Sequence, residues 1–323
     1  MKRFLSIALI LLPMIASAQT TEFKRPKITG IAHIGIFTND LRNAAELFSG
    51  YLGFGQPHYI TRNPGSTEPD MMFIKINDRQ YVEFFRDDEN KLVKYRHTAF
   101  ETDDVEAMRL YLRSKGVVVG DKVIDTGFGF KALFCKDFNG HEVEFLEYTG
   151  DGFIGEMKGA NMPDTRISDT FRYVGWICPD SAKDIAFYGY ILGFTEFWRG
   201  GETPEKINWI KMRLPESDDY VELMLFDHDL SQFELGLFNH MDLDMESVQA
   251  AKEILDGRRL PEGCRPAENQ STGICGYGLS NVYLRDGTRV ELMTKTAVSG
   301  TPSPSTYGLP LRYDGDMEHL LYK

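Results

Sequence analysis

The chain has 323 residues, a formal net charge of −12 and no cluster of basic residues. A surface this acidic repels a phosphate backbone, which argues against a nucleic-acid partner. Only four cysteines occur and none forms a CxxC pair, so a cysteine nucleophile is not indicated.

The first eighteen residues have the pattern of a signal peptide. Lys2 and Arg3 precede an apolar run from Phe4 to Ile15, and residues 16–18 are the small residues that signal peptidase recognises. The run is too short to span a bilayer as a helix. We therefore expect cleavage after Ala18, a secreted or periplasmic protein without a membrane partner, and a mature chain of 305 residues (323 less 18), enough for two domains.

Two segments 140 residues apart share one pattern. IAHIGIFTND, residues 31–40, and FRYVGWICPD, residues 171–180, are alternating apolar segments that end in an Asp suited to cap a helix. A helix-like segment follows each, and both copies reach a glycine at the same distance, Gly53 and Gly193. A strand, a helix and a turn therefore recur in register.

A second pair of segments begins at His97 and His240 and also runs into helix-like sequence. In all four units the expected helix cap stands seven positions after the first residue: Asp40, Asp104, Asp180 and Ser247. Each unit closes, 47 to 51 residues after its start, with a strand that contains a glutamate. This length accommodates a strand, a helix and three more strands, so the sequence predicts an α+β fold of four βαβββ modules paired into two domains.

The repeat also divides the chain. The predicted parts are a signal peptide (1–18), a first domain (28–149), a linker (150–170), a second domain (171–296) and a C-terminal tail (297–323). Gly140 and Gly287 each precede a closing strand and predict a hairpin turn. Cys135 and Cys178 lie in apolar strands and should be buried, whereas Cys264 and Cys275 are close enough in sequence to form a disulfide, and whether they do is open.

Polar residues at matched places in the first two units predict a metal site. Glu83 and Glu144 stand between apolar residues in strands, and His33 and His97 begin mostly apolar strands. Each alone fits a surface residue or a satisfied core residue, but paired units would bring all four into one cup. Histidine nitrogen and carboxylate oxygen suit one divalent ion, Zn, Mn, Fe, Co or Ni, without selecting among them.

The second half carries a weaker set at the same places: Tyr173, Glu222, His240 and Glu291. This set predicts either a degenerate site that shapes a pocket or a second metal site. A further hypothesis is that four side chains line the first cup and bind an anionic group: Tyr59, Arg62, Arg86 and Lys131.

Four segments together resemble a known family: AHIGIFTNDLRNAAELFSGYLGF, YVEFF, RHTAFETDDVEAMRLYLRSKG and KDFNGHEVEFLEY. The family is the vicinal oxygen chelate superfamily, which includes glyoxalase I, methylmalonyl-CoA epimerase, fosfomycin-resistance proteins and extradiol dioxygenases. The resemblance covers nearly the whole mature chain and implies two tandem glyoxalase-like domains. It places His33, Glu83, His97 and Glu144 on the family's four ligand positions, as in bacterial glyoxalase I, whereas epimerases of the family usually have Gln at the position of Glu83.

The resemblance also implies chemistry. In such members a metal ion holds vicinal oxygens and stabilises an enediolate while a glutamate moves the proton, so Glu83 and Glu144 are the candidate catalytic residues. The expected function is a secreted metal-dependent isomerase, epimerase or lyase acting on a small oxygen-rich substrate. One alternative is an extradiol-type dioxygenase, although Tyr173 then replaces the first iron-binding histidine of the second domain. Another is a non-catalytic small-molecule binding protein, and a homodimer is also open.

Overall fold

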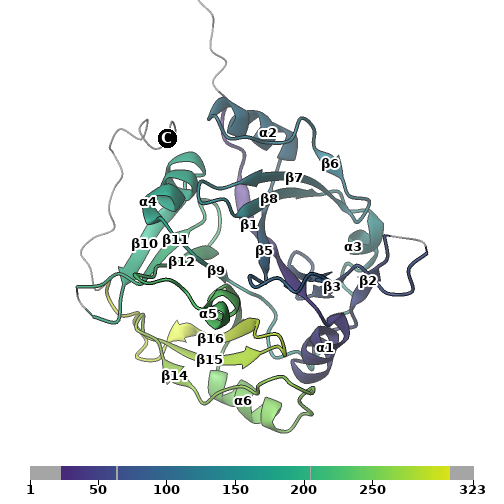
Figure 1. The fold of residues 1–323 in the computed structure, drawn as a ribbon, viewed down its shortest axis with the longest axis vertical. Helices are drawn as coiled ribbons and strands as arrows, with labels where there is room; N and C mark the ends of the chain where they lie inside the picture. The colour runs from purple at the N-terminus through teal and green to yellow at the C-terminus, as the bar shows by residue number, and fades with distance from the viewer. Residues whose placement is uncertain (1–22, 63–64, 204, 306–323) are drawn as a thin grey trace, which may run out of the picture.

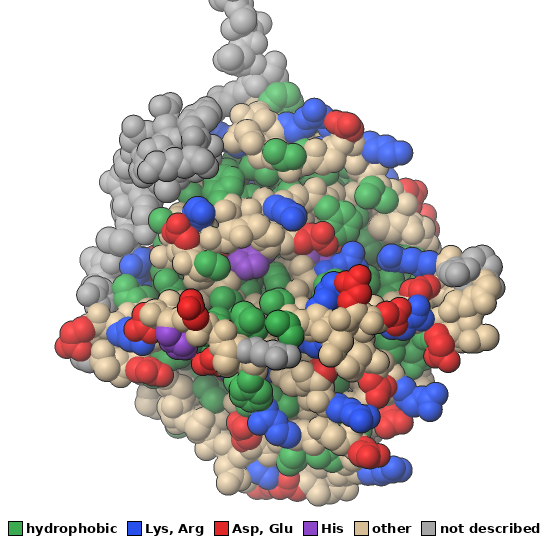
Figure 2. Space-filling view, in the orientation of Figure 1, with side chains coloured by type: hydrophobic (Ala, Val, Ile, Leu, Met, Phe, Trp, Pro, Cys, Tyr) green, Lys and Arg blue, Asp and Glu red, His purple; other side chains and the backbone are tan. Residues whose placement is uncertain are grey.

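The computed structural model describes residues 23–62, 65–203 and 205–305 (Figure 1). The expected signal peptide and residues 306–323 of the expected tail lie outside the described residues. Within those ranges, none of the helices combines the length and the apolar character that crossing a membrane requires. Figure 2 shows acidic and basic side chains interspersed over the drawn part of one face.

The first curled sheet has eight strands in the order β2-β3-β4-β1-β5-β8-β7-β6. Their bounds are β1 (Ile28–Thr38), β2 (His58–Ile60), β3 (Met71–Lys75), β4 (Tyr81–Arg86), β5 (Tyr95–Thr102), β6 (Ile124–Asp125), β7 (Phe130–Lys136) and β8 (Glu142–Tyr148). β1 pairs in parallel with β4, and β5 with β8, while β1 and β5 are antiparallel at the centre. Each module therefore closes on its own first strand, and the two modules meet at β1 and β5.

The second sheet repeats this order as β10-β11-β12-β9-β13-β16-β15-β14. Its strands are β9 (Tyr173–Ile177), β10 (Thr195–Gly200), β11 (Trp209–Arg213), β12 (Tyr220–Met224), β13 (His240–Met245), β14 (Ser271–Thr272), β15 (Tyr277–Tyr283) and β16 (Arg289–Ala297). The predicted α+β fold of four paired βαβββ modules is confirmed.

Four helices begin where the sequence predicts, and two short ones, Gly152–Glu156 and Gln232–Leu237, were not predicted. They are α1 (Leu41–Ala45) with η1 (Glu46–Tyr51), α2 (Val105–Ser114), α3 (Gly152–Glu156), α4 (Ser181–Asp184) with η2 (Ile185–Ile191), α5 (Gln232–Leu237) and α6 (Val248–Asp256). All four expected caps accept a hydrogen bond from a backbone N–H of the first turn: Asp40, Asp104, Asp180 and Ser247. The expected hairpin turns are also present, with positive φ at Gly140 (97°) and Gly287 (90°).

The first helix of each domain widens into a π-helical turn, which the sequence did not reveal. The N–H of Leu52 donates to the carbonyl of Leu47 at 2.8 Å, and that of Leu192 to Phe187 at 3.0 Å, each bond spanning five residues. Over a single turn, the apolar spacing of an α-helix and a π-helix is too similar to separate them from sequence alone.

One continuous apolar core joins the two domains, which lie side by side in Figure 1. The ring of Phe100 packs on those of Tyr188 and Phe194, with centroids 6.4 and 5.4 Å apart. A buried side chain, Gln80, adds polar contacts: its Nε2 donates to the carbonyl of Phe171 at 2.7 Å, and its Oε1 accepts from the N–H of the same residue at 3.2 Å. The first residue of the second domain is therefore hydrogen-bonded to the first domain through its backbone.

A polar network also crosses the boundary. His141 Nδ1 lies 2.8 Å from Asp137 Oδ2, which accepts from the Tyr188 hydroxyl at 3.1 Å. Asp184 accepts from the Asn139 side chain at 2.7 Å. His141 and the two aspartates lie close enough to hold a metal ion, but these bonds already engage both carboxylates, which favours a structural role. Burial lowers the pKa of His141, but the hydrogen bond to Asp137 and its charge outweigh burial and raise it.

We predict that His141→Gln destabilises the protein in a pH-dependent way. A histidine whose pKa is raised by folding contributes its full stability below its unfolded pKa of about 6.5 and loses it as pH rises through the folded value. The substitution should therefore cost about 1–2 kcal/mol at pH 6 and less at pH 9, measured by urea unfolding. His228→Gln, at an exposed histidine, is the control and should change stability little. An equal loss at both pH values for His141→Gln would contradict the assignment.

Candidate metal centre

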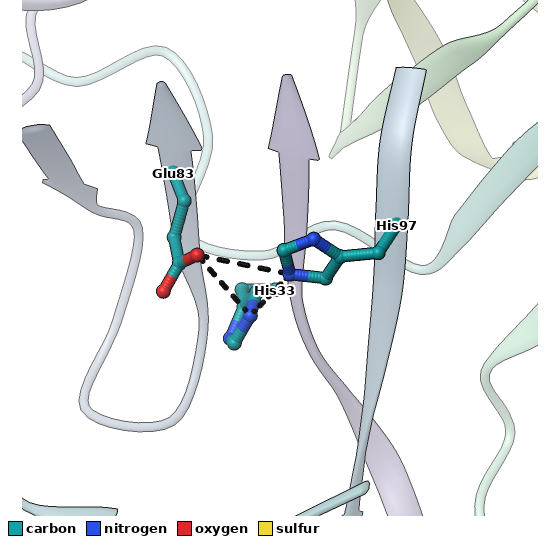
Figure 3. Close-up of side chains that lie close together, drawn as sticks. All are labelled: His33, Glu83 and His97. Atoms are coloured by element: carbon teal, nitrogen blue, oxygen red, sulfur yellow. Dashed lines mark hydrogen bonds and ion pairs between the residues drawn. The ribbon is translucent and has the colours of Figure 1, made fainter. Parts of the chain in front are cut away.

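The four side chains predicted as ligands come together in the first sheet. His33, Glu83, His97 and Glu144 lie on β1, β4, β5 and β8, four neighbouring strands at the sheet centre. All four are buried, with side chains at most 5% exposed. Figure 3 shows three of them, His33, Glu83 and His97, pointing toward one another. We call the set of four the first cup.

The distances between the donor atoms fit one bound ion. His33 Nε2 and His97 Nε2 lie 3.0 Å apart, and Glu144 Oε2 lies 3.2 and 3.1 Å from them. Glu83 Oε2 is slightly farther, at 3.5 Å from His33 and 3.7 Å from His97. Ligand atoms about 2.0–2.2 Å from one metal ion lie about 2.8–3.6 Å from each other, depending on the geometry. The donor atoms of His33, Glu83 and His97 therefore lie close enough together to hold one metal ion, and Glu144 lies within 3.2 Å of both histidines.

The charges in the first cup also favour a cation. Burial raises the pKa of Glu83. Burial would raise that of Glu144 too, but the charges and hydrogen bonds of His33 and His97 outweigh it and lower the pKa to about 2. Burial lowers the pKa of His33, but Glu83 and Glu144 raise it overall. With both imidazoles neutral, as metal ligation requires, the first cup holds two buried negative charges, which a divalent ion would offset.

A glycine makes room for the second histidine. Gly35 lies opposite His97 in the β1–β5 pairing, and a Cβ at this glycine would stand 2.4 Å from the imidazole ring. The second domain repeats the arrangement, since a Cβ at Gly175 would stand 2.3 Å from the ring of His240. These glycines were not predicted as part of the site, although the sequence contains a signal for them: each stands two residues after the first residue of its repeat.

The first cup opens into a cavity of about 320 Å³. Phenylalanines and two arginines line it: Phe85, Phe128, Phe130, Phe134, Arg62 and Arg96. Arg96, which the sequence analysis did not single out, stacks on Phe85 with its guanidinium carbon 3.7 Å from the ring centroid.

Of the four residues suggested for anion binding, only Arg62 lines this cavity. Tyr59 and Arg86 line a separate cavity, and Lys131 is exposed on β7. The hypothesis was therefore wrong for these three, because alternation along a strand does not show which cavity a side chain near its end will face.

The weaker set also converges, in what we call the second cup. His240 Nε2 lies 3.6 Å from Glu222 Oε2 and 3.5 Å from Glu291 Oε2. Tyr173 packs its ring edge-on to His240, with centroids 5.6 Å apart. Two basic side chains that the sequence analysis missed stand beside the carboxylates, Lys211 and Arg289.

All four cysteines are free thiols. Cys135 and Cys178 are buried, as predicted. Cys264 does not pair with Cys275: its Sγ lies 3.2 Å from Asn43 Oδ1, whereas the Cys275 Sγ accepts from Lys211 Nζ at 3.4 Å.

Comparison with known proteins identifies the family. Residues 30–145 match the model of the Glyoxalase/Bleomycin resistance protein/Dioxygenase superfamily. The first domain is thus a member of this superfamily, mostly metal-dependent enzymes, and the second domain repeats its topology. The predicted resemblance to the vicinal oxygen chelate superfamily is confirmed. Among curated protein sequences, none matches the chain significantly.

Solved structures share the two-domain fold. The Mn(II)-bound glyoxalase from Novosphingobium aromaticivorans is 16% identical, with a TM-score of 0.61 over 90% of this chain and 97% of that one. The 2,3-dioxygenase LapB from Pseudomonas sp. KL28 is 14% identical, with a TM-score of 0.62 over 89% and 98%. Homoprotocatechuate 2,3-dioxygenase from Arthrobacter globiformis is 14% identical, with a TM-score of 0.59 over 84% and 81%. At such identities the likeness establishes the fold and leaves the reaction open.

We predict that Gly35→Ala weakens metal binding at least tenfold, because the added methyl group displaces the His97 ring. The measurement is competition for Zn²⁺ against a chelator of known affinity. Gly175→Ala is the matched control, since it places the same clash under His240 in the other domain. Equal losses in the two variants would mean that the substitution disturbs the whole fold and not the first cup.

Proposed function

We propose that the protein is an exported, metal-dependent enzyme that moves a proton at a carbon next to a carbonyl group, as an isomerase, an epimerase or a lyase. The observation that carries the proposal is the first cup, where two histidines and two carboxylates converge beside a cavity. Proton transfer next to a carbonyl requires a base and a positive charge near the oxygen, and this donor set can provide both.

A divalent ion held there supplies a Lewis acid that favours negative charge on a substrate oxygen. The two carboxylates differ in position. Glu144 lies within 3.2 Å of both imidazole Nε2 atoms and is best placed as a ligand. Both glutamates line the cavity, but Glu83 is farther from the imidazoles, at 3.5 and 3.7 Å, so it is the better candidate to take and return the proton.

The cavity indicates a small substrate with an anionic group. Its volume of about 320 Å³ accommodates a compact molecule, and its phenylalanines give it a partly apolar wall. Arg62 and Arg96 line the same cavity and would bind a carboxylate or a phosphate. Export, which the pattern of residues 1–18 supports, argues against a glutathione adduct as the substrate, because glutathione is scarce outside the cytoplasm.

A second candidate function is an extradiol-type dioxygenase. In its favour, two of the similar structures are 2,3-dioxygenases that match across both domains. Against it, Tyr173 stands where the resemblance implies a histidine in the second cup, which leaves the iron-binding triad incomplete. Proton transfer in the first cup is therefore the preferred function.

The first test is the metal content of the mature protein purified without chelators. We expect about one ion per chain in the parent protein and none in the His33→Ala/His97→Ala variant. The matched control, Tyr173→Phe/His240→Gln, should keep its ion because it changes only the second cup. If the parent holds no metal even after Zn, Mn, Fe, Co and Ni are added back, the enzyme proposal fails and a non-catalytic binding protein becomes the better explanation.

A second test separates the two reaction types. With small α-hydroxy ketones and aldehydes in D2O, the metal-loaded protein should exchange the carbon-bound hydrogen, followed by NMR, without consuming oxygen. Glu83→Gln should slow this exchange about 10²–10⁴-fold while retaining the ion, because it removes only the base. Oxygen uptake with catechols, in the absence of exchange, would instead establish the dioxygenase.

A further inference from the structure

The two cups differ at two positions that the strand register makes equivalent. On β3 and β4, Phe73 lies opposite Glu83, whereas on β11 and β12 the position opposite Glu222 is Lys211. The second cup thus contains a lysine where the first has a phenylalanine.

The second difference lies on the closing strands. On β5 and β8, His97 lies opposite Glu142, whereas on β13 and β16 the partner of His240 is Arg289. An acidic residue of the first domain is therefore replaced by a basic one in the second.

These two basic side chains neutralise the second cup without a metal ion. Lys211 Nζ lies 3.3 Å from Glu222 Oε1, and Arg289 Nη2 lies 3.4 Å from Glu291 Oε2. All four side chains are largely buried, the most exposed, Arg289, at 14%. Glu222 and Glu291 thus each have a basic partner, and a divalent ion between them would be placed beside two positive charges. The second cup does not fit a metal ion.

Lys211 is held firmly in this place. The rings of Tyr173, Trp198 and Tyr220 surround its ammonium group, with centroids 5.5, 5.6 and 5.3 Å from Nζ. The Lys211 ammonium group also contacts Glu222 and, at 3.4 Å, the Cys275 sulfur. These contacts hold its positive charge beside the second cup.

The interior of the second sheet is also more polar than that of the first. Two residues after His97 stands Ala99, which packs in an apolar cluster with Met71 and Phe73. Two residues after His240 stands Asp242, a fully buried acid.

Lys211 is one of the residues that line a cavity of about 510 Å³. Four aromatic side chains line this cavity, Phe197, Trp198, Tyr220 and Tyr277, together with two further basic residues, Arg172 and Arg213. Among the described residues that line it, the one acid is Asp218, whose side chain is 95% exposed. Flat aromatic walls and basic side chains suit a ligand that combines a ring with a negative charge.

We propose that the aromatic cavity beside the second cup, which Lys211 borders, is a metal-free binding site for a small aromatic carboxylate, in which Lys211, Arg172 and Arg213 supply the positive charge. This site is independent of the reaction proposed for the first domain.

Metal uptake tests the electrostatic half of the proposal. The His33→Ala/His97→Ala chain, equilibrated with Zn²⁺ or Mn²⁺, should bind no ion. Adding Lys211→Phe and Arg289→Glu copies the first-domain residues into the second cup and should restore about one ion per chain. If the His33→Ala/His97→Ala chain binds an ion and His240→Gln removes it, the proposal is overturned. It is also overturned if the fourfold variant folds, as judged by circular dichroism, but binds no metal. If the fourfold variant does not fold, the metal content of the starting variant decides.

Ligand binding tests the other half, with benzoate as the probe and calorimetry on protein freed of metal by EDTA. Benzoate should bind saturably and at least tenfold more tightly than benzamide, its neutral isostere. Lys211→Met should weaken benzoate at least tenfold, whereas Lys122→Met, at an exposed lysine, and His33→Ala/His97→Ala should leave it unchanged. No benzoate binding, equal affinity for benzamide, or an unaffected Lys211→Met variant would each overturn the proposal.

Discussion

The buried glutamates of the two cups are the constraint on which the rest of the molecule depends. Such groups are costly inside a protein unless positive charge accompanies them. The first cup sets Glu83 and Glu144 against two imidazoles only, and the donor atoms of His33, Glu83 and His97 lie close enough together to hold one metal ion. The second cup gives each carboxylate a basic partner from the chain itself. The same fold thus meets one electrostatic requirement in two ways, and this difference separates the proposed roles of the domains.

The architecture explains why the carboxylates meet at all. Each βαβββ module returns to pair in parallel with its own first strand, so the residue that begins a module and the glutamate that ends it lie on neighbouring strands. Two modules joined through β1 and β5 then place four such residues on one surface. A glycine beneath the histidine of the second module removes the one side chain that would block its ring. The shared core and the buried Gln80 join the two sheets into one body.

The fold does not select the reaction, because a glyoxalase and two dioxygenases share it at similar levels of structural agreement. The features that distinguish the possible reactions are local: which residues replace the metal-binding set in each sheet, which carboxylate lies farther from the histidines, and which side chains line each cavity. These features favour proton transfer in the first domain. In the second domain, Lys211 and Arg289 lie beside the buried glutamates and offset their charge.

The sequence by itself determined the repeat, the four helix caps and the α+β class. The alternation of apolar and polar residues, the capping residues and their spacing are local properties, so they can be read directly along the chain. It also picked out His33, Glu83, His97 and Glu144 as one set, because they recur at matched positions of the repeat. Only the tertiary structure revealed Lys211, Arg289 and Arg96, and showed that Tyr59 and Arg86 face another cavity. A basic residue in a strand has the same local pattern whether it faces solvent or a buried carboxylate. Its partner lies on another strand, and the pairing of strands distant in sequence decides which of the two it meets.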